Sequence, residues 1–448
     1  MKSIRIGSGA GYAGDRLEPS LSLIKGGNLN YICYECLAER TIAIGQQIKL
    51  KDPAKGYNEL LEYRMEQALP LCWLNKVSLI TNMGAANPEA AVERCLEIAR
   101  RHGLYGMKIA CVTGDDFLPD IEKYMDAQVW EHHRPLRDLP GQIVSANVYL
   151  GVEGILSALA KGADVVITGR VADPSLFLAP AIHEFGWALD DWDKLGKGTM
   201  MGHLLECGGQ VTGGYFAEPG KKDVPRLSEL GFPIAEINED ASFVITKLEN
   251  AGGMVTRHTC AEQLCYEIHD PEAYLTPDVT ADFKNVSFAE VEKDKVKVDG
   301  GAGKSRPETL KCSIGYMDCF IGEGEISYGG YGSAARGELA IDILKKRLAL
   351  FGPDRFEELK FDLIGCNSLY WNPDRAIGGE PREVRVRVAG RTKTKQDADI
   401  IGREVEALYT NGPAGGGGAF QRTREIVSVA SILVDRFDAK PQVQIFIV

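Results

Sequence analysis

The sequence lacks a surplus of basic residues. Its 448 residues include 51 Lys and Arg against 63 Asp and Glu, which gives a formal net charge of -12. A nucleic acid or an anionic membrane surface is bound by clustered Lys and Arg, which displace counterions from phosphate. The longest basic run covers residues 345–347 and is explained by one face of a helix. We therefore expect neither a nucleic-acid partner nor a membrane partner.

Long apolar runs are also missing. No uninterrupted stretch approaches the roughly 20 residues that a membrane helix needs. The first residues, MKSIRIGSGAG, enter a β-branched run directly, without the apolar segment and cleavage site of a signal peptide. We expect a cytoplasmic protein.

Paired cysteine motifs and familiar hydrolase motifs are scarce. Eleven cysteines are spread over the chain, most of them in apolar runs, which indicates reduced and buried thiols. Cys33 and Cys36 form a single C-x-x-C, whereas a structural zinc site needs a second pair or two suitably spaced histidines. The absence of G-x-S-x-G and H-E-x-x-H excludes the usual serine hydrolases and zinc peptidases. We expect no metal, and packing is the simpler role of both thiols.

Five apolar, β-branched runs alternate with amphipathic segments in residues 1–186. Such alternation predicts an α/β domain with a parallel sheet that helices cover on both faces. Asn87 and Pro88 give one of the helices a capping residue and a first residue. The five runs, each with the glycine or polar cluster that ends its expected strand, cover residues 3–11, 29–36, 77–88, 108–116 and 163–175.

The rest of the chain changes pattern twice. Residues 187–304 are an irregular α+β segment that either extends the first sheet or covers its open edge as a lid. Strands are expected there over 242–248 and 254–259, and a helix over 260–270. Residues 305–448 follow the order β-α-β-β-α-β, which predicts a ferredoxin-like α+β domain. Its expected elements cover residues 310–330, 333–352, 361–371, 381–391, 395–412 and 424–436.

Polar and glycine residues follow all five predicted strands of the first domain. A parallel sheet binds its ligand at the carboxyl ends of its strands, so we expect these residues to share one cleft. Each of them, taken alone, suits a cap or a turn equally well. The candidates are Gly9, Gly11, Gly14, Glu35, Cys36, Asn82, Asp115, Asp116, Arg170 and Asp173.

Gly9, Gly11 and Gly14 have the spacing of a dinucleotide-binding turn. Glu35 follows Gly14 after 21 residues, where an acid bonds the ribose in dinucleotide folds. Two features oppose this interpretation, since Asp15 places negative charge beside a pyrophosphate and Pro19 shortens the helix that would hold it. A nucleotide or coenzyme A moiety is left open as the cofactor.

Two further segments have alternative interpretations. Residues 411–418 end in four consecutive glycines, and Gly415 and Gly416 suit either an anion-binding nest or a flexible connector. His203, Glu206 and Cys207 lie close together along the chain. They fit a polar helix face as well as they fit catalysis.

Long strings of the chain resemble one family. They include SGAGYAGDR, YECLAERT, TNMGAANP, DVVITGRVADPSLFLAP, HLLECGGQVTGGYFAEPG and NGPAGGGG, and the chain resembles the acyclic terpene utilization (AtuA) family from about Ile4 to Arg436. The resemblance implies a bacterial-type catabolic protein for branched acyclic terpenoid acids handled as coenzyme A thioesters, without fixing the reaction. Some members carry an additional small C-terminal domain, so the resemblance leaves room for a separate small subunit.

The candidate residues favour acid/base chemistry. Glu35 is the first candidate for general base or acid, and repulsion between Asp115 and Asp116 is expected to raise one pKa. Arg170 suits a substrate carboxylate or phosphate, and Cys36 is a nucleophile only if its thiolate is favoured.

These groups suit proton abstraction next to a carbonyl, followed by loss or addition of water. We therefore expect a hydratase or dehydratase whose substrate is a branched acid or its acyl-CoA. An NAD(P)-dependent oxidoreductase is the alternative, and a non-catalytic subunit that works with a small partner protein is the third. We expect a homo-oligomer.

Overall fold

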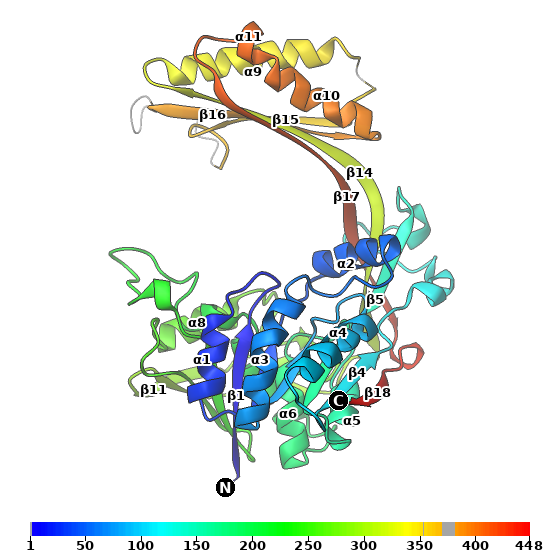
Figure 1. Ribbon diagram of the computed structural model, residues 1–448, viewed down its shortest axis with the longest axis vertical. Helices are drawn as coiled ribbons and strands as arrows, with labels where there is room; N and C mark the ends of the chain where they lie inside the picture. Colours follow the sequence, from blue (N-terminus) through cyan, green and yellow to red (C-terminus); the bar gives the residue numbers. More distant parts are fainter. Residues whose placement is uncertain (1, 353, 370–380) are drawn as a thin grey trace. The chain divides into compact units, whose positions relative to one another are not determined.

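The computed structural model describes residues 2–352, 354–369 and 381–448. It forms two compact units, which Figure 1 shows coloured along the chain. The first unit comprises Met1–Leu139, Ile143–Gly315 and Val429–Val448, and the second comprises Pro140–Gln142 and Tyr316–Ser428. These units do not coincide with the ranges 1–186, 187–304 and 305–448. The reason is that residues 187–304 join the first sheet and the chain returns to the first unit after residue 428.

Five parallel strands form the centre of the sheet in the first unit. All five strands predicted there are confirmed, and each is a short apolar run that is largely buried. Their spatial order is β1 (Ser3–Ala10), β2 (Tyr31–Tyr34), β3 (Ser78–Thr81), β6 (Val165–Thr168) and β4 (Lys108–Thr113). Because parallel strands end at one edge, this order brings residues that are far apart in the sequence together.

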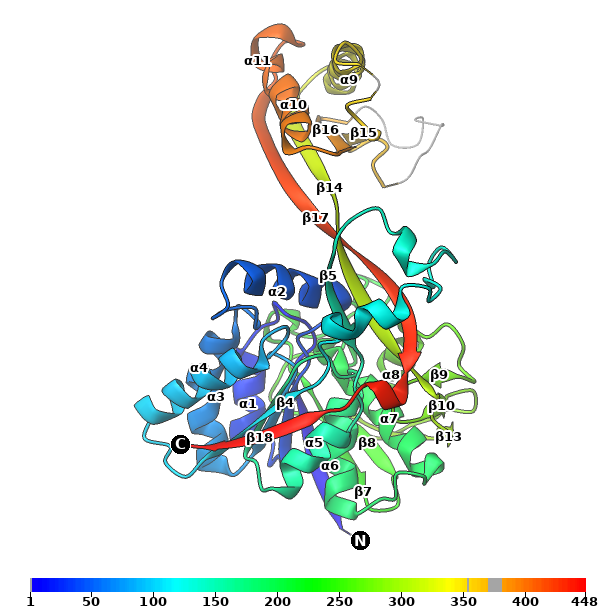
Figure 2. The same cartoon turned by 90° about the vertical axis from the view of Figure 1, so that its right-hand side faces the viewer.

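Antiparallel strands extend this sheet at both sides, so it is mixed rather than purely parallel. On one side lie, in spatial order, β7 (Pro233–Asn238), β8 (Phe243–Lys247), β12 (Lys295–Asp299) and β11 (Ser287–Glu292). On the other side β18 (Gln442–Ile447) pairs with β4, as Figure 2 shows. The segment 187–304 therefore extends the sheet, and β18 is a strand that the sequence pattern did not predict.

Helices cover both faces of the sheet (Figure 2). One face packs against α1 (Glu18–Gly26), α3 (Leu61–Asn75) and α4 (Pro88–Arg101), and the other against α5 (Glu153–Ala160), α6 (Ser175–Phe185) and α7 (Trp192–Glu206). The predicted start of α4 is confirmed, since Asn87 Oδ1 accepts a hydrogen bond from the Ala90 N–H at 3.4 Å. Throughout the described part of the chain, every helix is too short or too polar to cross a membrane.

The strand predicted over residues 254–259 is wrong. Thr256 instead caps α8 (Arg257–Cys265), and it exchanges hydrogen bonds with Thr259 at 3.0 and 3.2 Å. Reciprocal capping of this kind satisfies backbone N–H groups and outweighs the β-propensity of the run. The smaller elements of the first unit are α2 (Glu39–Lys51), β5 (Ile143–Val148), β9 (Tyr274–Leu275), β10 (Thr280–Asp282) and β13 (Ala302–Lys304).

The second unit follows the predicted order β-α-β-β-α-β. Its elements are β14 (Thr309–Gly329) from residue 316 on, α9 (Ser333–Ala349), β15 (Glu358–Ile364), β16 (Glu383–Thr392), α10 (Lys395–Glu406), α11 (Leu408–Asn411) and β17 (Gly417–Asp435) up to residue 428. The sheet order is β15-β16-β14-β17, with β16 between the two strands that α9 connects. Residues 370 and 371, at the end of the predicted strand 361–371, lie outside the described residues.

A close backbone contact joins the loop after β1 to the end of α7. A Cβ atom at Gly11 would lie 2.3 Å from the carbonyl carbon of Cys207 and 2.6 Å from the nitrogen of Gly208. No side chain fits in this space, so glycine is required at position 11. The contact sets the loop that follows β1 directly against residues 206–208.

Replacing Gly11 by Ala is expected to lower the free energy of unfolding by about 1–3 kcal/mol, because backbone atoms must move to accept the methyl group. Gly417→Ala is the matched control, since nothing lies within 4 Å of the Cβ position there. Its effect should stay within about 0.5 kcal/mol. Urea unfolding followed by circular dichroism measures both, and equal effects would contradict the packing role of Gly11.

Candidate functional site

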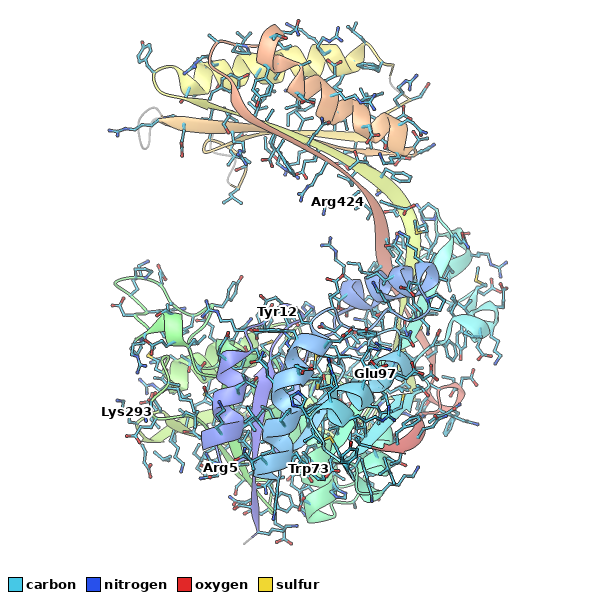
Figure 3. All side chains as sticks on the ribbon, viewed as in Figure 1. Arg5, Tyr12, Trp73, Glu97, Lys293 and Arg424 are labelled. Carbon is cyan, nitrogen blue, oxygen red and sulfur yellow. The ribbon has the colours of Figure 1, made fainter. Side chains whose placement is uncertain are left out.

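A cavity of about 1280 Å³ lies at the carboxyl edge of the parallel strands, within the first unit. Gly11 follows β1, Glu35 follows β2 and Asp173 follows β6, and all three line this cavity. The end of α7 contributes Glu206 and Cys207. Figure 3 shows Tyr12, a further lining residue, at this edge of the sheet, whereas Arg5 lies at the opposite edge.

The cavity has a polar and an apolar part. Glu35 and Glu206 are at most 8% exposed, and together with Asp173 they form what we call the acidic floor. Side chains that are 40 to 87% exposed form what we call the apolar rim. The rim consists of Tyr12, Trp130, Tyr215, Leu227, Leu275 and Leu433.

Glu35 is held in place by two hydrogen bonds to one oxygen. Its Oε1 accepts from the Leu37 N–H at 2.8 Å and from Asn82 Nδ2 at 3.1 Å. Burial, followed by the negative charge of Asp173, raises the pKa of Glu35 well above its usual range. The carboxyl therefore keeps its proton at a pH where an exposed glutamate is ionised. Asn82 acts as the residue that positions it.

Arg170 is fully buried and its donors are already used within the protein. Nη1 donates to the Leu37 carbonyl at 2.5 Å, Nε donates to the Val171 carbonyl at 2.9 Å, and Nη2 pairs with Asp173. The guanidinium also lies 4.4 Å from the centre of the Tyr149 ring. It is not among the residues that line the cavity. The structure thus gives Arg170 the role of holding Asp173, in place of the predicted contact with a substrate anion.

Asp115 and Asp116 lie away from the cavity lining. Asp115 Oδ2 accepts hydrogen bonds from the Arg170 N–H at 2.9 Å and from Asn147 Nδ2 at 3.0 Å. Burial raises the pKa of Asp115 to about 6, and Asp116 contributes a smaller part. Asp116 is exposed and accepts a hydrogen bond from the Leu118 N–H. The expected raised pKa is therefore present, but burial is its main cause and the pair supports the backbone.

Cys36 is a packed thiol. It is 1% exposed, and Arg64 Nη1 lies 3.1 Å from its sulfur. Burial raises its pKa, although Arg64 opposes the shift. The thiolate that a nucleophile requires is thus disfavoured, and the side chain lies outside the cavity lining. Packing, the simpler of the two interpretations, accounts for Cys36.

The glycine turn is filled by a side chain of the protein itself. Asp15 accepts hydrogen bonds from the Gly11 and Arg16 N–H groups, both at 2.8 Å. Gly9 lies within β1, against the Tyr34 ring, and Gly14 lies against Tyr12. A carboxylate therefore occupies the N–H groups that would face a pyrophosphate in a dinucleotide-binding turn.

The second glycine run lies in the second unit. Gly415 has a φ of +74°, and Arg336 Nη1 donates to the neighbouring Ala414 carbonyl at 2.8 Å. Gly416 packs against the Tyr328 ring. Carbonyl oxygens gather around the Arg336 guanidinium, whereas an anion-binding nest presents N–H groups. This glycine run is therefore a turn whose backbone accepts a hydrogen bond from an arginine, and it does not have the geometry of an anion-binding nest.

A buried histidine and a glutamate form a pair at the end of α7. His203 Nε2 lies 3.2 Å from the Leu264 carbonyl, which only accepts, so this nitrogen carries a proton. His203 Nδ1 lies 2.8 Å from Glu206 Oε1, and the proton between them belongs to either group. Burial raises the pKa of Glu206 to about 7. Burial lowers the pKa of His203, but the Glu206 charge and the hydrogen bonds to Glu206 and Leu264 together outweigh it, and the pKa is raised overall.

The second carboxylate oxygen of this pair, Glu206 Oε2, makes no hydrogen bond to His203. It is buried and has no hydrogen-bond partner among the residues that the structure describes, while Glu206 lines the cavity. A buried carboxylate oxygen without a partner is costly in a folded protein, which points to a ligand as its partner. The spacing of His203 and Glu206, three residues apart on a helix, was the signal for this pair in the sequence.

Among the cations that line the cavity, Lys311 is neutralised by a carboxylate, whereas Arg16 is exposed and donates to the Ser228 carbonyl. Lys311 Nζ donates to Glu39 at 2.8 Å, and the Tyr149 hydroxyl donates to the same carboxylate at 2.5 Å. Although burial opposes it, these donors lower the pKa of Glu39 to about 2. Sequence patterns did not single out Glu39, Tyr149 or Lys311, because they come from a helix start, a strand end and a distant strand.

Comparison with known proteins identifies one family. A protein-family model described as "Acyclic terpene utilisation family protein AtuA" matches residues 4–445. No curated protein and no solved structure matches the chain.

Asp115 gives a test of these electrostatics. Its raised pKa means that the unfolded chain loses this proton at lower pH than the folded protein, so ionisation destabilises the fold as pH rises. The Asp115→Asn variant has no carboxyl group at this position, so this destabilisation by ionisation is absent. The stability of the variant relative to the wild type should therefore improve by about 3 kcal/mol between about pH 3 and about pH 7, most of it as pH rises from about 4 to about 6. Urea unfolding over this range measures it, and a difference that does not vary with pH would contradict the assignment.

Proposed function

We propose that this chain, which belongs to the acyclic terpene utilisation family AtuA, is a hydro-lyase. Family membership gives it a role in acyclic terpene utilisation. The reaction that we propose is the addition of water to a branched acyclic carboxylic acid or its coenzyme A thioester, or the reverse.

The observation that carries the proposal is Glu206 Oε2, for which the described part of the chain offers no hydrogen-bond partner. This oxygen belongs to a buried carboxylate that lines the cavity, and His203 lies directly behind it. When Oε2 takes a proton from a substrate, the proton shared between Glu206 Oε1 and His203 Nδ1 can move onto Nδ1, and it can return along the same hydrogen bond. Such a pair suits a general base whose pKa lies near the pH at which it works.

Glu35 supplies the complementary group. Its raised pKa keeps it protonated, so it can donate a proton to a leaving hydroxyl. For dehydration, Glu206 removes a proton from the carbon next to the carbonyl while Glu35 protonates the hydroxyl on the adjacent carbon. The C–H and C–O bonds break, a C=C bond forms and water leaves. Hydration is the reverse of these steps: Glu35 takes a proton from the attacking water, whose oxygen bonds to the carbon that bore the hydroxyl, and Glu206 returns a proton to the carbon next to the carbonyl.

The charge of Asp173 affects both proton-transfer groups. Its negative charge raises the pKa of both Glu35 and Glu206. Arg170 fixes it, because the pair is formed within three residues of the chain and the guanidinium is fully buried. Asp173 is thus a positioning residue that keeps both neighbours within range of protonation.

The substitution Glu206→Gln is expected to lower kcat by at least about 100-fold, since an amide cannot accept the proton. The assay follows the gain or loss of one water by branched unsaturated acyl-coenzyme A thioesters, using mass spectrometry. Glu97→Gln is the matched control, because Glu97 is 51% exposed on α4 and lies outside the cavity lining. Turnover of Glu206→Gln at the rate of this control would remove Glu206 from the mechanism.

The substitution Glu35→Gln tests whether Glu35 is the general acid. In the wild type, kcat should fall as pH rises through the raised pKa of Glu35, because the donor must be protonated. The variant should lose most of its activity, and its remaining rate should no longer show this fall. Asp116→Asn should keep the wild-type profile, since that carboxylate is exposed and outside the cavity lining. A wild-type pH profile in Glu35→Gln would argue against the assignment.

A further inference from the structure

The proposed reaction needs a hydrogen-bond donor besides its general acid and its general base. Removal of a proton next to a carbonyl places negative charge on the carbonyl oxygen, and a donor fixed beside that oxygen stabilises the charge. Lys311 and the Tyr149 hydroxyl are not free for this task, because both donate to Glu39. Arg16 is exposed, so water competes for its charge. A donor that the protein shields from water is better suited.

Tyr274 lines the cavity and offers a hydroxyl without a partner. Its side chain is half-buried, and its hydroxyl makes no hydrogen bond to any residue that the structure describes. The ring packs against the His203 ring, with 5.4 Å between the ring centres, and against the Phe283 ring at 5.6 Å. Pairing of Tyr274 with Ala281 joins β9 to β10 and fixes the backbone. The tyrosine is thus held directly beside the histidine of the buried pair.

The Tyr274 hydroxyl and the Glu206 carboxylate do not satisfy each other. Glu206 Oε2 has no hydrogen-bond partner in the described part of the chain, although both residues line the cavity. Burial, followed by the charges of Glu206 and Asp173, raises the pKa of Tyr274 well above its usual range. The hydroxyl therefore keeps its proton and acts as a donor. A carbonyl compound suits both groups, because its oxygen accepts a hydrogen bond and the carbon next to it carries the proton that Glu206 removes.

We propose that the Tyr274 hydroxyl donates to the carbonyl oxygen of the substrate, so that Glu206 and Tyr274 together convert the carbonyl compound into its enolate. Glu206 Oε2 takes the proton from the carbon next to the carbonyl. The C–H electron pair forms a C=C bond, and the carbonyl π pair moves onto the oxygen that Tyr274 binds. Tyr274 keeps its own proton. The inference rests on the proposed function and adds an activity, which is enolisation of thioesters that have no hydroxyl to lose.

The test measures exchange of hydrogen for deuterium next to the carbonyl of isovaleryl-coenzyme A in deuterium oxide, by mass spectrometry. This thioester is saturated and has no hydroxyl on its acyl chain, so it neither loses nor adds water. The wild type should exchange this hydrogen, and Tyr274→Phe should do so at least about 100-fold more slowly, as expected for loss of one oxyanion donor. Tyr105→Phe is the matched control, since Tyr105 is 71% exposed and lies outside the cavity lining.

Two further measurements separate this role from a structural one. Tyr274→Phe keeps the ring and removes a hydroxyl that lacks a partner among the described residues, so urea unfolding should show no loss of stability. Exchange should accelerate as pH rises through the pKa of Glu206, which is raised to about 7. The midpoint of this rise should shift by less than about half a pH unit in Tyr274→Phe, whereas a hydroxyl that only positions Glu206 would shift it further.

Three results would overturn the inference. They are no exchange by the wild type, exchange by Tyr274→Phe at the rate of Tyr105→Phe, and slower exchange that accompanies a shifted midpoint or a loss of stability. The hydro-lyase proposal can fail separately. A protein that exchanges this hydrogen but never gains or loses water on acyl thioesters keeps the inference and loses that proposal. A protein that turns over water without any exchange does the reverse.

Discussion

The site depends on the burial of one guanidinium. Arg170 is fully buried, and a buried cation is tolerated only when its donors are satisfied and its charge is balanced. It meets this requirement by binding the segment after β2 through Leu37, the segment after β6 through Val171 and Asp173, and the ring of Tyr149 after β5. Three strand ends are thereby joined at one point. The cavity lies directly in front of them.

Burial of this cation also explains the chemistry of the acids. Arg170 compensates Asp173, and the remaining floor carboxyls face limited solvent and a neighbouring negative charge. Both effects favour the protonated form, so the pKa values of Glu35 and Glu206 rise. Glu206, whose pKa is raised to about 7, exchanges protons near neutral pH, whereas Glu39, bound to Lys311, stays ionised. The carboxyl groups of one cavity wall thus differ in protonation because their neighbouring groups differ.

The glycine turn shows how the same residues can serve a different purpose. Its spacing matches a nucleotide-binding turn, yet Asp15 binds the N–H groups and Gly11 is needed for contact with the backbone at Cys207. That contact brings the end of α7, and with it Glu206, to the carboxyl edge of the sheet. The glycine therefore builds the site through packing.

The sequence by itself determined the five parallel strands, the helix capped by Asn87 and the place of Glu35 and Asp173 at one edge. These follow from local apolar patterns, turn residues and the rule that parallel strands end together. Only the tertiary structure decided that Arg170 turns inward, that Asp115 supports its backbone and that Lys311 and Tyr149 meet Glu39. It also decided that β18 joins the first sheet. Such contacts join residues far apart in the chain, and their partners depend on burial and charge that no local pattern records.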